Sequence, residues 1–190
     1  MLISPFDDDY AWLQIVIDLL RGAGFTILSS HRRLILEQAK RLLLEKGRLS
    51  FLDLTEEIQR IIENKFESVR DRNRLELPLE ILASVIDQLH LSHGNHLPLE
   101  ILLKRDAVIR MHKLSQKLQT FMASFILSWL SHFKDFSGDR ETPLLCTFDE
   151  AKLLLAKEKE RSADIPPMRI RFTQMRFLNT GFILADQHPS

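Results

Sequence analysis

The sequence predicts a mainly α protein: a bundle of five to six helices with a small C-terminal appendage of one helix and a β-hairpin. Three observations lead to this prediction. Apolar residues recur at intervals of three and four over most of the first 136 positions, glycine or proline ends several of these stretches, and strand-like alternation begins only at residue 168. We therefore expect a helical core domain over 1–136, a linker over 137–146, and a C-terminal helix and β-hairpin over 147–190 that pack on the core.

The first helix is expected to follow the acidic run 7–9, because aspartate accepts hydrogen bonds from the free N–H groups of a first helical turn. From Trp12 to Leu20 the apolar side chains occupy more than one face, so this helix should be deeply buried. Gly22 and Gly24 mark its end. The short apolar run that follows, 25–28, is compatible with a strand.

A second helix is expected to begin at a cap formed by Ser29 or Ser30 and to end at Gly47. Basic residues gather in its C-terminal half, where the helix dipole favours positive charge. Helical periodicity then continues over 50–69, with an apolar stripe opposite a charged face. The polar, charged stretch 70–74 predicts a break.

The middle of the chain contains one hexapeptide twice, Leu-Pro-Leu-Glu-Ile-Leu, at 77–82 and at 97–102. Proline is well tolerated at a first helical position, and a glutamate within the first turn suits the helix dipole. Both copies therefore predict helix starts, on either side of a Gly-Asn turn. The second of these helices is expected to extend from Pro98 to Phe136, with a break near Asp106 because so long a helix is unusual in a globular protein.

The C-terminal part of the chain changes character. Residues 137–143 are polar and contain glycine and proline, which is typical of a linker. A capping box predicts a helix over 149–161. Residues 168–174 alternate polar and apolar side chains, and a turn at 179–181 precedes the apolar run 182–184, so we expect a small β-hairpin there.

Two segments resemble known families. Residues 77–89 resemble the first helix of an F-box, because Leu-Pro-Leu-Glu-Ile-Leu is followed by the apolar residues Val85, Ile86 and Leu89. This resemblance implies F-box-like docking to an adaptor of a ubiquitin ligase. Residues 89–97 similarly resemble one unit of a leucine-rich repeat. The alternative interpretation of the same residues, two successive helix starts, requires neither family.

Composition limits the classes of partner. The 26 basic and 26 acidic residues give a formal net charge of zero, so no overall field directs the chain to nucleic acid or to an anionic membrane. The single cysteine, Cys146, excludes an intramolecular disulfide framework and favours a reducing, cytoplasmic location. The N-terminal residues lack the pattern of a leader, and the most apolar window, 121–130, is too short to span a bilayer. We expect no membrane insertion.

Catalytic motifs are lacking in the sequence. Ser30 beside His31 does not by itself give triad geometry, and no glycine-rich phosphate-binding motif occurs. His90, His93 and His96 lie in or beside a turn without a cysteine, so we interpret them as solvated loop residues and not as zinc ligands. We therefore expect no enzymatic activity, no cofactor and no metal.

A nucleic-acid-binding regulatory protein is one functional hypothesis. Residues 35–58 resemble the opening of a winged-helix domain, in which a small polar residue leads into the second helix. In the predicted C-terminal hairpin, Arg169, Arg171 and Arg176 interleave with two phenylalanines, a pattern suited to phosphate contacts combined with base stacking.

The preferred hypothesis is a non-catalytic helical interaction protein, an adaptor or an assembly subunit of a larger protein complex. Several predicted helices are apolar over more than one stripe, which exceeds what a surface helix needs to pack on its own core. The second copy of the hexapeptide supplies the candidate partner-binding residues: Leu97, Leu99, Ile101 and Leu102. Burial within this chain is the competing explanation for the same apolar surface.

Overall fold

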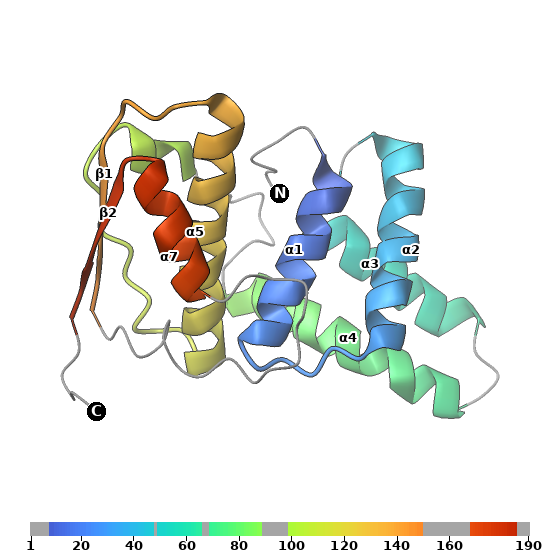
Figure 1. Ribbon diagram of the computed structural model, residues 1–190. Coiled ribbons are helices and arrows are strands. Elements are labelled where there is room, and N and C mark those ends of the chain that lie inside the picture. The colour runs from blue at the N-terminus through green and yellow to red at the C-terminus, as the bar shows by residue number, and fades with distance from the viewer. Residues whose placement is uncertain (1–7, 48, 66–68, 89–98, 150–167, 186–190) are drawn as a thin grey trace. The chain divides into compact units, whose positions relative to one another are not determined.

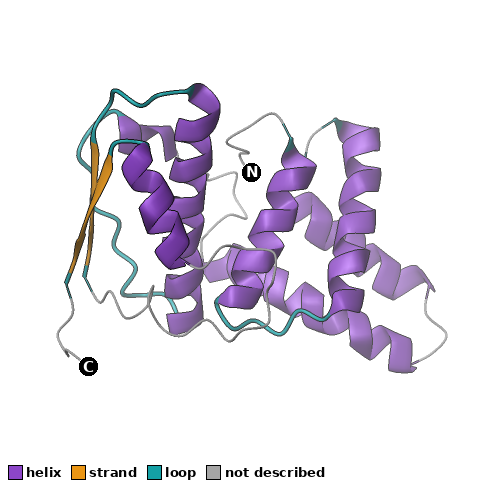
Figure 2. Cartoon of the chain, in the orientation of Figure 1, coloured by secondary structure: helices purple, strands orange, loops and turns teal. Residues whose placement is uncertain are grey.

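A computed structural model describes residues 8–47, 49–65, 69–88, 99–149 and 168–185 (Figure 1). Over these ranges the chain forms six α-helices, one short 3₁₀ helix and two short strands, and helices clearly dominate (Figure 2). The predicted fold class, mainly α with a small two-stranded element towards the C-terminus, is confirmed.

The chain separates into two compact units. Unit 1 comprises Met1–Ile17 and Phe25–Leu97, and unit 2 comprises Asp18–Gly24 and Pro98–Ser190. The domains expected from the sequence, 1–136 and 147–190, stay a prediction, because compactness does not test whether a segment folds by itself. Of the predicted linker 137–146, the last three residues belong to a strand, and the predicted helix 149–161 lies almost wholly outside the described residues.

The first helix, α1, spans Asp9–Gly22 and begins as predicted. The Asp8 carboxylate accepts a hydrogen bond from the Ala11 N–H at 2.8 Å, so an aspartate of the acidic run caps the first turn. Gly24, which has a left-handed φ of 92°, follows the end of the helix. The helix buries apolar side chains on more than one face: Trp12, Leu13, Val16, Ile17 and Leu20.

The second helix, α2, spans Ser29–Lys46 and ends at Gly47, whose φ of 68° is left-handed. Its predicted cap at Ser29 or Ser30 is wrong, because Leu28 occupies the cap position. The buried His31 stabilises the start of the helix, because its Nδ1 accepts a hydrogen bond from the Leu28 N–H at 3.4 Å. Residues 25–28 form no strand.

Helix α3 spans Phe51–Lys65, and Ser50 caps it by accepting the Asp53 N–H at 3.0 Å. The apolar stripe predicted for this segment is buried at Leu54, Ile58, Ile61 and Ile62. Helix α4, Val69–Gln88, packs on α3 and α2. The break predicted at 70–74 is therefore wrong, because these residues belong to α4.

The two hexapeptide copies have different structures. The first copy does not start a helix: Pro78 lies inside α4, where it removes one backbone hydrogen bond but keeps its ring buried. The second copy enters a 3₁₀ helix, η2, which spans only Leu99–Leu103. The predicted break near Asp106 is confirmed, but the helix expected on both sides of it is not, because residues 104–115 are not helical and the next helix, α5, spans Gln116–Ser137.

Unit 2 ends in a small parallel sheet instead of a hairpin. Strand β1, Leu144–Phe148, pairs in parallel with strand β2, Thr180–Leu184. Residues expected to form a strand at 168–174 belong instead to helix α7, Met168–Phe177. The physical reason lies next to the segment: two prolines directly precede it, which suits a helix start, and it contains no glycine or proline.

Candidate interaction surface

One face of the β1–β2 sheet is covered by helix α7, which in turn packs on α5 (Figure 1). The Phe182 ring on β2 meets the Phe172 ring of α7 edge to face, with centroids 4.7 Å apart. It also stacks near the Phe148 ring of β1 at 6.5 Å. These aromatic contacts fix which side of the sheet faces inward.

The opposite face of the sheet is apolar and exposed. Leu145 is 64% exposed and Ile183 is 50% exposed. The register pairs Leu145 with Gly181 and Thr147 with Ile183, so the two apolar side chains project on the same side of neighbouring strands. A Cβ placed on Gly181 would lie only 3.2 Å from Leu145 Cδ1, so the leucine lies against the space above this glycine.

Two exposed aromatic residues occur at the helix ends of the same unit. Phe177 closes α7 and is 78% exposed, and Phe136 lies in the last turn of α5 and is 65% exposed. Both helices end at the same end of unit 2, where β1 and β2 begin (Figure 1). We call Leu145 and Ile183, which share the outer face of the sheet, the apolar flank.

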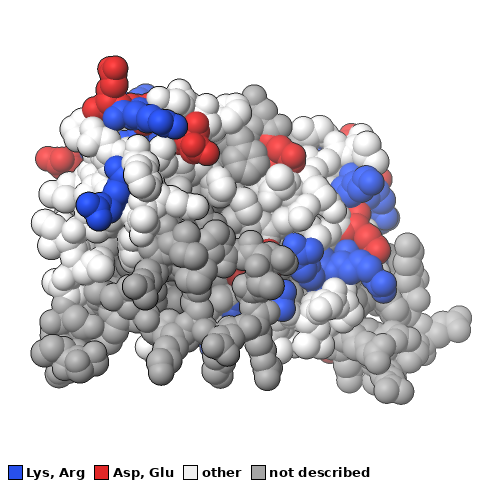
Figure 3. All heavy atoms as spheres, viewed as in Figure 1, with Lys and Arg blue, Asp and Glu red and all other residues white. Residues whose placement is uncertain are grey.

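In Figure 3 several acidic and basic side chains of unit 2 lie near the loop that joins α5 to β1, and a basic side chain also interrupts the uncharged surface below them. Exposed apolar surface bordered by charge is typical of a protein-binding site.

A set of hydrogen bonds holds the α5–β1 loop and thereby positions β1. The fully buried Lys134 donates from Nζ to the Thr142 carbonyl at 2.7 Å. The Asp139 carboxylate accepts the Thr142 N–H at 2.9 Å, which is the main reason that its pKa is lowered. Asn179, in a left-handed conformation, donates from Nδ2 to the Glu141 carbonyl at 3.2 Å and ties this loop to the start of β2.

The lysine and the cysteine of this region are poorly suited to nucleophilic chemistry. Burial raises the pKa of the Cys146 thiol to about 11, although Lys134 opposes the shift. At neutral pH the thiol is therefore protonated, and the thiolate is the reactive form. Burial also lowers the pKa of Lys134, against the influence of Asp139 and Cys146, but the side chain is closed off from solvent.

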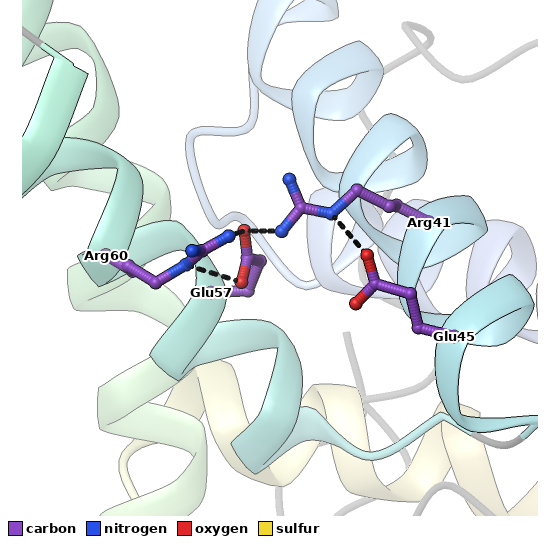
Figure 4. Close-up of polar contacts among 4 residues, drawn as sticks. All are labelled: Arg41, Glu45, Glu57 and Arg60. Carbon is purple, nitrogen blue, oxygen red and sulfur yellow. Dashed lines mark hydrogen bonds and ion pairs between the residues drawn. The ribbon is translucent and has the colours of Figure 1, made fainter.

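Unit 1 contains a different kind of polar cluster, which joins α2 to α3 (Figure 4). Glu57 on α3 accepts hydrogen bonds from Arg41 on α2 and from Arg60 one turn along α3, the latter at 2.8 Å. Arg41 also pairs with Glu45 at 3.3 Å. The hydrogen bond from Arg60 is the largest influence that lowers the pKa of Glu57. We call these four residues the α2–α3 charge cluster.

The residues considered for nucleic-acid binding do not form one basic face. Arg176 is exposed at the end of α7. Positions 169 and 176 are two helical turns apart and share a side of α7, whereas position 171 falls on the other side, and the side chains of Arg169 and Arg171 lie outside the described residues. In the winged-helix-like segment 35–58, Arg41 is engaged by two glutamates.

The residues considered for partner binding give a mixed result. Leu99 is buried within unit 2 and Leu102 is half-buried, while Leu97 and the side chain of Ile101 lie outside the described residues. The apolar flank was not among the sequence-derived candidates. The sequence contains one signal for this surface: residues 144–148, Leu-Leu-Cys-Thr-Phe, form an uncharged run between acidic residues.

His90, His93 and His96 also lie outside the described residues. Across the described ranges, no three histidine, cysteine, aspartate or glutamate side chains converge as a metal site would require. None of the described helices combines the length and the apolar character needed to cross a bilayer. Compared with protein-family models, with curated proteins and with solved structures, the chain gave no match in any of the three.

Proposed function

We propose that this chain is a non-catalytic interaction protein, an adaptor or assembly subunit that binds another protein through the apolar flank of unit 2. The observation that carries the proposal is the exposed outer face of the β1–β2 sheet, with Leu145 and Ile183 side by side. A cytoplasmic, reducing setting is part of the proposal, and the unpaired thiol of Cys146 is compatible with it.

The physical argument concerns what a parallel sheet needs. Parallel strands are normally buried on both faces, because their connections place helices over the sheet. Here α7 covers one face, while on the other face Leu145 and Ile183 keep half or more of their surface exposed. Burial of both side chains by a partner would remove apolar surface from water, which is favourable by roughly 25 cal/mol per Å².

The test is a double substitution in the apolar flank, Leu145→Asp with Ile183→Asp. Both positions are exposed, so unit 2 should keep its far-ultraviolet circular dichroism and its unfolding midpoint. The protein is produced at near-native level in its own cells, and quantitative mass spectrometry compares the proteins that co-purify with each form. We expect the variant to lose its main partner by at least about tenfold, because buried unpaired charges are costly at an interface.

Leu44→Asp provides the matched control, since Leu44 is an exposed leucine on α2 in unit 1. This variant should retain the partner at the wild-type level. If the double variant and the wild type co-purify with the same proteins in the same amounts, the proposed function is wrong.

A further inference from the structure

We draw no further inference here: the strongest candidate, the outer face and edge of the β1–β2 sheet at Leu145 and Ile183, belongs to the surface already described, and nothing in the described part of the structure shows what covers it.

Discussion

The α2–α3 pair of unit 1 and the β1–β2 pair of unit 2 differ in the side chains that they expose to solvent. Between α2 and α3 the apolar stripes are buried, and the rim carries the charge cluster of Arg41, Glu45, Glu57 and Arg60. The strand pair buries one face against α7 and leaves leucine and isoleucine on the other.

The difference lies in how exposed apolar side chains are grouped: Leu44 on α2 is exposed singly beside charged residues, whereas Leu145 and Ile183 share one uncharged face of the sheet. A charged rim interacts well with water and gives a neighbouring protein little to bury. An uncharged strand with an exposed apolar face gains by being covered. The contrast supports our proposal that the strand pair binds a partner, and substitutions on each side of the sheet and in each unit test it.

The largest expected effect compares the two faces of β2. Phe182→Ala removes an inward ring that contacts Phe172 and Phe148, so we expect unit 2 to lose about 3 kcal/mol of unfolding free energy. Ile183→Ala, on the outward face, should cost less than about 0.5 kcal/mol. Urea unfolding followed by circular dichroism measures both. Equal losses would mean that the outer face is also packed.

The next effect concerns the lysine that holds the α5–β1 loop. Lys134→Ala leaves a cavity and removes the hydrogen-bond donor of the Thr142 carbonyl. We expect unit 2 to lose about 2–3 kcal/mol of unfolding free energy. Lys134→Met fills most of the space and removes the cost of burying a charge, so it should cost about 1 kcal/mol or less. Urea midpoints for both variants test this ranking. The reverse order would show that the charge itself holds the loop.

In unit 1 the charge cluster should contribute less than these packed side chains. Glu57→Gln replaces the charged partner of Arg41 and Arg60 with a neutral side chain. We expect unit 1 to lose about 1–2 kcal/mol of unfolding free energy, and no more because both arginines keep contact with solvent. The matched control, Glu45→Gln, alters the more exposed glutamate and should cost about 0.3 kcal/mol. Unfolding midpoints at low and high salt compare the two. A larger loss at Glu45 would contradict the assignment of Glu57 as the centre of the cluster.

A smaller, pH-dependent effect is expected at the start of α2. Burial lowers the pKa of His31 below its ordinary value of 6.5, so above that pH the side chain is neutral in the folded and unfolded chain alike. As the pH falls below 6.5, the unfolded chain binds the proton first, and unit 1 loses stability down to the pKa of the folded state. Protonation also removes the acceptor of the Leu28 N–H.

Unfolding measured at about pH 7.5 and about pH 5.5 tests the role of His31. His31→Gln keeps an acceptor but cannot titrate, so it should reduce the difference between the two conditions. His112→Gln, at an exposed histidine, should leave that difference unchanged. An undiminished pH effect in the His31 variant would exclude this histidine as its source.

The helices with local signals were predictable from sequence, and those that depend on distant packing were not. Asp8 and Gly47 mark the ends of helices through contacts within a few residues, so their roles could be recognised. Pro78 suggested a helix start by the same local rules. Its helix continues through it, and the following residues Ile81, Leu82, Val85 and Ile86 are all buried.

The partner of the last strand was predicted wrongly for a related reason: the run 182–184 lies in β2 as expected, but it pairs with β1 and not with 168–174. Over the few residues from Met168, alternating arginine and apolar side chains fit a strand or one side of a helix, and no local rule separates the two. The parallel pairing joins segments on either side of α7, which no turn signal reports. Exposure of Leu145 and Ile183 depends on which face α7 covers, so the candidate site required the fold.

The most direct test of the central claim is hydrogen–deuterium exchange of the full-length protein, purified alone and within the native complex that we propose it forms in its own cells. We expect the complex to slow exchange over 144–148 by about tenfold and to leave the exposed face of α2 unchanged. Protection confined to α2, with the strand pair exchanging as in the free protein, would contradict the assignment of partner binding to unit 2.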